Sequence, residues 1–264
     1  MTTQATSIRR RLADNIRRVR DRIEDACAKA ARSPSDVTLV AVTKAVDLDI
    51  VRLSMEMGLL DLGESRAQQL DQRAAMIQEF LKRRQVLAHD APALRPRWHM
   101  VGHLQTNKIR LVLPWCDLIH SVDSLRLAEE LNEQADRAGR DVPMLLQVNT
   151  SGERSKFGVV VGAVPYVIEQ MMELPRIRLR GLMTMAPLDA TPAEVRLYFD
   201  RLREVFEELR QNREAGPEFD QLSMGMSNDY TIGIAAGATL VRIGTALFEG
   251  IAGVPTAEAT DDAP

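Results

Sequence analysis

The sequence is poor in cysteine, in aromatic residues and in long apolar runs, and each shortage excludes a class of protein. Two cysteines, Cys27 and Cys116, stand far apart among 264 residues, which is too few for a disulfide framework and fits no metal-binding spacing. No apolar run is long enough to span a bilayer, and the first residues contain no apolar segment of the kind that signal peptides carry. We therefore expect a cytoplasmic protein that contacts no membrane.

An excess of positive charge is also missing. The formal net charge is −3 and the pI is about 5.9, whereas proteins that bind nucleic acid broadly present a basic face. The arginines between residues 9 and 18 are interleaved with acidic residues between 14 and 25, a pattern typical of a solvated helix face. We expect no nucleic-acid partner.

Aliphatic side chains are abundant. Hydrophobic residues make up 45% of the chain and aromatic residues only 4%, a balance typical of parallel α/β folds. After residue 36, short apolar runs alternate eight times with helical segments, most of them amphipathic. This alternation predicts a single (β/α)8 barrel of the TIM type. The alternative is a doubly wound sheet, which usually has a glycine-rich turn after its first strand, and the segment TKAVDL at that place contains no glycine.

The expected elements can be placed along the chain. An extra N-terminal helix precedes the barrel, with an apolar stripe from Ile8 to Cys27 and Ser7 as its N-cap. The eight expected strands are VTLVAVT from Val37, LLDLG from Leu59, RWHMVGHL from Arg97, DLIHSVD from Asp117, PMLLQVN from Pro143, IRLRGLMTM from Ile177, QLSMGMS from Gln221 and TLVRIGTALF from Thr239. The expected helices between them cover residues 48–57, 67–83, 105–112, 124–138, 164–174, 192–213 and 230–236. We place one domain over residues 1–250 and expect a disordered tail over residues 251–264.

A lysine follows the first expected strand, at the end of the barrel where ligands bind in this fold. Lys44 comes directly after the buried run LVAVT. Partial desolvation there would favour the uncharged amine, which can attack a carbonyl and form a Schiff base. The same spacing also fits a lysine whose ammonium group reaches water from a strand end. The spacing leaves both interpretations open.

The last two strands lead into a predicted anion site. Loops after strands seven and eight of such barrels frequently bind phosphate. Here they contain Ser223-Met224-Gly225-Met226-Ser227 and Arg242-Ile243-Gly244-Thr245. The two glycines let backbone amides approach an anion, and the side chains of Ser227, Thr245 and Arg242 are donors. The structural alternative is a pair of tight turns with Arg242 in a surface ion pair. An amine opposite a phosphate site suits a small phosphorylated carbonyl compound, such as pyridoxal phosphate or the sugar phosphate of an aldolase.

Other polar residues are expected to be structural. His99 and His103 have no third ligand in a recognisable pattern, so we expect no metal site. The aspartates around His120 resemble an acid–base set, but capping and hydrogen bonding at strand ends explain them. Lys156, in SGERSKFG after the fifth strand, is interpreted as a solvated loop lysine, although a second functional amine could lie in such a loop.

The segments that carry these residues resemble a known family. VTLVAVTK, DLGES, WHMVGHLQTNK, LIHSVDS, LLQVN, RLRGLMTMAP, LSMGMSND and AAGATLVRIGTALF occur in order between about residues 10 and 250. Together they resemble the YggS/PROSC family of pyridoxal-phosphate homeostasis proteins. The resemblance implies a fold-type III barrel like the N-terminal domain of alanine racemase. It also implies that Lys44 holds pyridoxal 5′-phosphate as a Schiff base, that the SMGMS and RIGT segments bind the phosphate, and that Ser65 lies beside the cofactor.

Three positions depart from the family pattern. Ser65 follows Glu64 where the family often has asparagine, Val46 stands where a second lysine is common, and Phe157 stands where a small residue is common. Because Lys44 and the phosphate-binding segments are kept, we expect cofactor binding to survive and its exchange to differ.

The resemblance implies a carrier that binds and buffers pyridoxal 5′-phosphate in vitamin B6 and amino-acid homeostasis. No residue is assigned a catalytic role, and apo forms of pyridoxal-phosphate enzymes are the expected partners beyond the cofactor. The alternative is a fold-type III enzyme, a racemase or a decarboxylase. Racemases of this fold add a β-domain after the barrel and complete their site from a dimer partner. The chain ends about sixteen residues after the eighth expected strand, so we expect no such domain and a monomer.

Overall fold

Eight parallel strands close into a ring. A computed structural model describes residues 3–87, 93–212 and 215–251. The strands of the ring are β1 (Thr38–Val42), β2 (Asp61–Glu64), β3 (Arg97–Met100), β4 (Cys116–Val122), β5 (Val142–Asn149), β7 (Ile177–Met183), β8 (Gln221–Ser223) and β9 (Leu240–Ile243). Each strand pairs in parallel with the next one in this order, and β9 pairs with β1, which closes the ring. The predicted (β/α)8 barrel is confirmed.

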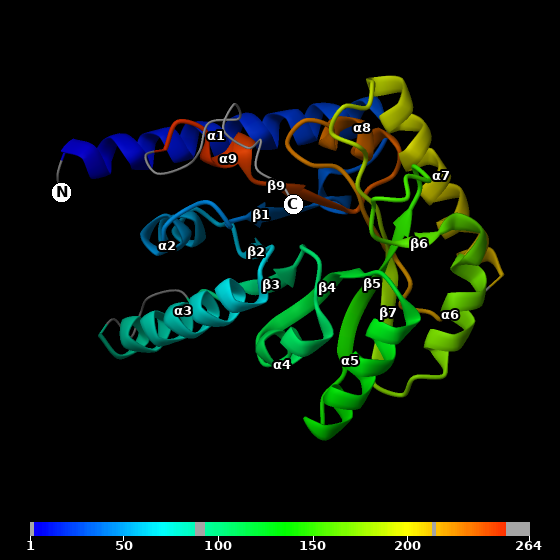
Figure 1. Ribbon diagram of the computed structural model, residues 1–264. Coiled ribbons are helices and arrows are strands. Elements are labelled where there is room, and N and C mark those ends of the chain that lie inside the picture. The colour runs from blue at the N-terminus through cyan, green and yellow to red at the C-terminus, as the bar shows by residue number, and fades with distance from the viewer. Residues whose placement is uncertain (1–2, 88–92, 213–214, 252–264) are drawn as a thin grey trace.

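Helices surround the ring of strands (Figure 1). They are α2 (Leu48–Glu56), α3 (Ala67–Leu87), α4 (Ile109–Val112), α5 (Leu125–Arg137), α6 (Val164–Met172), α7 (Pro192–Gln211), α8 (Tyr230–Ala235) and α9 (Thr245–Phe248). The hydroxyl of Ser124 caps α5, and Thr191 forms a capping box with Glu194 at the start of α7. These caps satisfy backbone amides that have no partner inside the helix, which is why the helices begin at these residues.

The extra N-terminal helix, α1 (Thr3–Lys29), packs against α8 and α9 along the outside of the barrel (Figure 1). Its predicted apolar stripe is buried, with Leu12, Ile16, Val19, Ile23 and Cys27 in the core. The predicted N-cap at Ser7 is wrong, because the helix begins at Thr3 and Ser7 lies inside it. Neither proline nor glycine stands between Thr3 and Ser7 to stop the helix earlier.

Three short elements differ from the sequence expectation. β6 (Val159–Val160) pairs with the end of β5 outside the ring, and α9 is a single turn. The expected helix over residues 105–112 is a 3₁₀ turn, Thr106–Lys108, followed by α4. Elements of two to four residues are too short to produce a recognisable period in the sequence.

Alternation along the strands separates two apolar regions. Val241 and Ile243 of β9 belong to the large core between strands and helices, whereas Leu240 belongs to a smaller cluster inside the ring, with Val40, Val101, Leu118, Leu145 and Met183. Because successive residues of a strand face opposite sides, Arg242 faces the inside of the ring, as Leu240 does.

The C-terminal end of the described chain is Ile251, which is buried against this core. The predicted disordered tail, residues 251–264, therefore begins too early, because Ile251 packs in the core; the rest of it, residues 252–264, lies outside the described residues. In the part of the chain that the structure describes, no helix is both long and apolar enough to cross a membrane.

Candidate functional site

Four neighbouring strands bring most of the predicted site residues to one stretch of the barrel rim. Their order around the ring is β2–β1–β9–β8. Ala41 of β1 is in register with Leu62 of β2 and with Ile243 of β9. Counting three residues onward from these pairs places Lys44 beside Ser65 on one side and beside Ala246, directly after Gly244 and Thr245, on the other. The loop after β8 follows next, so the predicted amine and the predicted anion site are adjacent.

Lys44 itself stands in a turn just beyond β1. Thr43 is buried, and Lys44 is exposed. The expectation that Lys44 is partly desolvated is therefore wrong. The sequence interpretation extended the buried strand to Thr43, directly before Lys44. The strand ends at Val42 and the chain turns at Lys44, which places this residue in contact with water.

The turn that contains Lys44 is held by side chains from the next β/α unit. Arg73 of α3 donates one hydrogen bond to the carbonyl of Thr43 and another to that of Val46, both at 2.5 Å. It also pairs with Glu64, with 2.7 Å between Nη1 and Oε1. Gln69 donates to the carbonyl of Lys44 at 3.0 Å. The backbone on both sides of Lys44 is thus fixed while its amine stays accessible.

Glu64 is the buried carboxylate that pairs with Arg73, and the two side chains form a clamp on the turn that contains Lys44. The Glu64 side chain is fully buried, and Oε1 also accepts a hydrogen bond from the Thr43 hydroxyl at 2.5 Å. Burial raises the pKa of Glu64, and the hydrogen bond from Thr43 and the charge of Arg73 oppose that rise. Oε2 has no hydrogen-bond partner among the described residues. Sequence reasoning assigned Glu64 no role and missed Arg73, which lies nine residues later on the following helix.

The loop after β8 provides backbone donors. Gly225 has φ +99°, and a Cβ there would lie 2.7 Å from the Cα of Tyr230, so only glycine fits. The two halves of the predicted anion site meet, because the Ala246 amide donates to the Ser227 hydroxyl at 3.3 Å. Within the described structure, no hydrogen bond is found for the amides of Gly225 and Ser227. Thr245 opens α9, so its amide has no acceptor within that helix.

The remaining residues of SMGMS have other partners. The side chain of Met224 lies in the outer core, and the Met226 amide donates to Asp229 at 2.5 Å. The hydroxyl of Ser223 is fully buried and lies 2.8 Å from Nδ1 of His120. It also accepts a hydrogen bond from Arg242. Ser223, Met224 and Gly225 are therefore buried, and Met226 and Ser227 form the partly accessible end of the segment.

Arg242 is a buried cation under this loop. Its side chain donates to Ser223 and, at 2.9 Å, to the carbonyl of Thr184 at the end of β7. Burial lowers the pKa of Arg242 to about 10, and the charge of Asp229 opposes the shift. The guanidinium therefore stays charged at neutral pH. The surface ion pair considered from the sequence is not formed, because Arg242 is only 4% exposed.

Comparison with known proteins places this geometry in a family. The model of the alanine racemase N-terminal domain matches residues 9–251. A pyridoxal phosphate homeostasis protein from Aquifex aeolicus is 37% identical over 89% of this chain and 96% of its own length. One from Pseudomonas aeruginosa is 39% identical over 90% and 94%. The chain belongs to this family of pyridoxal phosphate homeostasis proteins, within the alanine racemase N-terminal domain fold.

One solved structure shows a relative with its ligand. PipY from Synechococcus elongatus, solved with pyridoxal phosphate bound, is 32% identical, with a TM-score of 0.71 and coverage of 90% of this chain and 99% of its own. The resemblance inferred from the sequence motifs is thus confirmed.

A second cluster lies across the rim from Lys44, where this chain departs from the family pattern. His103, beyond β3, is 3.0 Å from Asp123, measured from Nδ1 to Oδ2. Its ring stacks on Phe157, with 4.0 Å between ring centroids and 15° between planes. The loop with Lys156 is therefore held against the loop after β3. Sequence reasoning missed this contact, because it joins loops that are distant in the chain.

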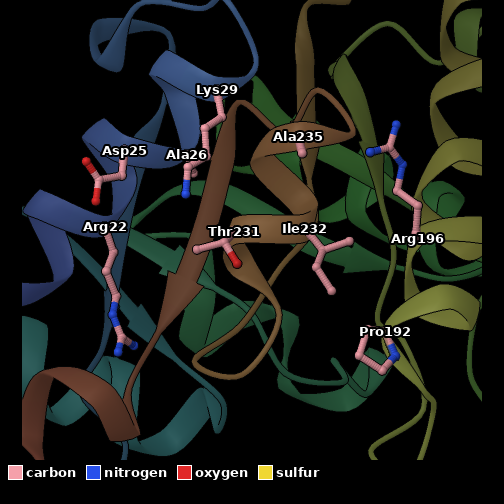
Figure 2. A pocket seen from close by; sticks show the side chains of 9 residues that line it. All are labelled: Arg22, Asp25, Ala26, Lys29, Pro192, Arg196, Thr231, Ile232 and Ala235. Atoms are coloured by element: carbon pink, nitrogen blue, oxygen red, sulfur yellow. The ribbon is translucent and has the colours of Figure 1, made fainter.

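Two other kinds of site were considered. Among the described residues no group of three or more His, Cys, Asp or Glu side chains is arranged to hold a metal ion. A cleft of about 620 Å³ lies on the outside of the barrel, between α1, α8 and the start of α7. Figure 2 shows the side chains that line it. Its charged side chains are Arg22, Asp25, Lys29 and Arg196. They come from helix surfaces rather than from strand ends, so this cleft is separate from the rim site.

Proposed function

We propose that the chain binds pyridoxal 5′-phosphate at the β2–β1–β9–β8 rim, with Lys44 as the attachment point. One observation carries the proposal. The exposed residue Lys44 lies beside the loops that follow β8 and β9. These loops contain backbone amides without a hydrogen-bond partner among the described residues, and the buried Arg242 lies beneath them. The names of the curated relatives, and the ligand of the PipY structure, support the same cofactor.

The residues present fit this group. The amides of Gly225, Ser227 and Thr245 are donors for a phosphate, and the charge of Arg242 lies beneath them. We call these three amides, with Arg242 beneath them, the phosphate cradle. The space between this cradle and Lys44 is flanked by Ser65, Gly244 and the Thr245 hydroxyl. Bound pyridoxal phosphate supplies an aldehyde that condenses with primary amines. The Lys44 amine would bond to that aldehyde carbon as a Schiff base, with release of water.

We propose a carrier rather than an enzyme for this site. The support is the exposure of Lys44, because an amine in contact with water leaves the carbon attached to it within reach of an incoming amine. A carrier that hands over its cofactor needs that access. We place this role in vitamin B6 and amino-acid homeostasis, in the cytoplasm, with apo-enzymes that use the cofactor as recipients and the protein acting as a monomer.

The test is spectroscopic and chemical. Purified protein mixed with pyridoxal 5′-phosphate should show the visible absorption band of a Schiff base, and Lys44→Ala should abolish it while the far-UV circular dichroism is unchanged. Lys156→Ala is the matched control and should keep the band. After borohydride reduction, the phosphopyridoxyl mass should map to the peptide containing AVTKAVD. A label on Lys156 or Lys108 instead would overturn the assignment of Lys44.

A further inference from the structure

The inside of the ring contains a row of polar side chains that the proposed function has not used. Asp61 of β2, His99 of β3, His120 of β4, Ser223 of β8 and Arg242 of β9 are all at most 8% exposed. Barrel interiors are normally filled by branched aliphatic residues, as the small inner cluster here also is. Burial of polar groups destabilises a fold unless each group finds a partner, so we expect each of these five side chains to have a hydrogen-bond partner inside the ring.

They form one continuous run of hydrogen bonds. Asp61 Oδ1 is 3.1 Å from Nε2 of His99, and Nδ1 of His99 is 2.9 Å from Nε2 of His120. Nδ1 of His120 is 2.8 Å from the Ser223 hydroxyl, which Arg242 also contacts. The contact between His120 and Ser223 crosses the inside of the ring, because β4 and β8 are not neighbours.

The run extends from one end of the barrel to the other. Asp61 is the first residue of β2 and is paired with Arg97, the first residue of β3, at 2.6 Å. Ser223 is the last residue of β8, and Arg242 contacts the carbonyl of Thr184, just beyond β7. The lower end thus reaches the surface at Arg97, and the upper end lies under the phosphate cradle.

The two ends fix the direction of every hydrogen bond between them. Arg242 can only donate, and an ionised Asp61 can only accept. Asp61 therefore receives the Nε2 proton of His99, which leaves Nδ1 of His99 to accept from Nε2 of His120. Nδ1 of His120 then accepts from the Ser223 hydroxyl, whose oxygen accepts from Arg242. Each donor and acceptor in the run has one partner when both histidines are neutral.

The charge states agree with this order. Burial would raise the pKa of Asp61, but hydrogen bonds from His99 and Arg97 bring it below its ordinary value. Burial and the nearby His99 and Arg242 lower the pKa of His120 well below 6.5. A proton added to either histidine would reverse the hydrogen bonds above it and leave the Ser223 hydroxyl without an acceptor.

We propose that His120, His99 and Asp61, acting through Ser223, are positioning residues that hold the Arg242 guanidinium in place beneath the cofactor. This role rests on the proposed function, because Arg242 matters to the ligand only if the rim site holds it. The arginine cannot turn away from the cradle without breaking its hydrogen bonds to the Thr184 carbonyl and to the Ser223 hydroxyl, which His120 holds in place.

The order of the hydrogen bonds can be measured without cofactor. Long-range ¹H–¹⁵N spectra of the full chain distinguish the two neutral tautomers of a histidine from its charged form, and the chain has only four histidines. At neutral pH, His120 should be neutral with its proton on Nε2, and His99 should donate its Nε2 proton to Asp61. A charged His120, or a proton on its Nδ1, would overturn the directed order.

The positioning role is tested by three variants and the visible band. His120→Leu removes both bonds of the imidazole, so the Ser223 hydroxyl that holds Arg242 loses its own acceptor. The affinity for pyridoxal 5′-phosphate should weaken about two- to tenfold, which is the effect of losing one hydrogen bond between neutral groups. It should also shift the band. His120→Gln keeps one donor and one acceptor and should restore part of the affinity. Leu118→Ala, two residues earlier on β4 and also inside the ring, is the control for general loosening of the interior and should leave the band unmoved.

The outcomes separate this role from the proposed function. If the wild-type protein does not bind the cofactor, the proposed function fails and this role fails with it. If the wild type binds, and folded His120→Leu binds as tightly with the same band, only the positioning role is overturned. An equal effect of Leu118→Ala would overturn it as well.

Discussion

The wild-type protein should lose stability between pH 7 and pH 5, and replacing His120 with glutamine should abolish most of that loss. In the folded state His120 stays neutral, because burial first, and then the neighbouring His99 and the charge of Arg242, hold its pKa well below 6.5. In the unfolded chain it takes up a proton as the pH falls through about 6.5. The unfolded state then binds more protons, so the free energy of unfolding decreases as the pH falls. The stabilisation is fully present above about pH 6.5 and is lost below it.

The size of this effect follows from one proton. If folded His120 binds no proton above pH 5, the free energy of unfolding decreases by about 2 kcal/mol from pH 7 to pH 5, because only the unfolded chain takes up the proton. The pKa of Asp61 is lowered from 3.8, so its contribution is lost only at lower pH. Glu64, whose pKa is raised by burial, titrates in both proteins and cancels in the difference.

Urea unfolding of wild type and His120→Gln at pH 7, 6 and 5 provides the measurement. The glutamine variant should be less stable at pH 7, because it packs less well, yet its stability should change less with pH. Equal decreases in the two proteins would refute the reasoning, since His120 would then be protonated in the folded state or would not contribute. A protein of this kind is usually stable by about 5–15 kcal/mol, so a difference of 2 kcal/mol is readily resolved.

Three other predictions concern the rim and the state of the chain. Arg73→Met should destabilise the fold by about 3–5 kcal/mol in urea unfolding, because it leaves the carboxylate of Glu64 buried without its partner, whereas Arg83→Met, which breaks an exposed pair with Glu79, should change stability by about 0.5 kcal/mol or less. Gly225→Ala should abolish cofactor binding in a visible titration, because its Cβ would meet Tyr230; Gly139→Ala, also at positive φ but with open space around it, should cost about 1–2 kcal/mol of stability and leave binding intact. Sedimentation should give a monomer mass at all concentrations, and a concentration-independent dimer would contradict this.

The barrel could be predicted because its signals are local. Each strand is a short apolar run, and each main helix has its own apolar stripe and often its own cap, as at Thr191. β6 and α9 could not be predicted because two and four residues contain no period. The N-cap at Ser7 failed for the opposite reason, since a residue suited to capping also fits inside a helix that begins earlier.

The backbone parts of the proposed site were predicted from the sequence and stay a prediction. Gly225 and Gly244 mark the proposed cradle, and the order of the strands places their loops beside the turn that contains Lys44. What could not be predicted is the support around those residues. Arg73 contacts Glu64 and the turn at Lys44 from the next helix, and His120 reaches Ser223 across the ring. Such partners are set by the closed barrel and not by spacing along the chain. The exposure of Lys44 depended on where β1 ends, which one residue decides.

The supports of the two ends of the site differ in kind, and the difference bears on what a carrier must do. At the amine end the clamp of Arg73 and Glu64 fixes only the backbone, so Lys44 keeps a free side chain in contact with water. At the anion end, the charge of Arg242 is buried and held through Ser223 by a run of bonds that ends at Asp61. A ligand held at both ends would therefore keep its phosphate fixed while its attached carbon stays accessible to another amine. An enzyme would need the opposite at the amine end, because proton transfer to a chosen face requires a placed base and the exclusion of water. We infer that the site is arranged for retention through the phosphate and exchange at Lys44.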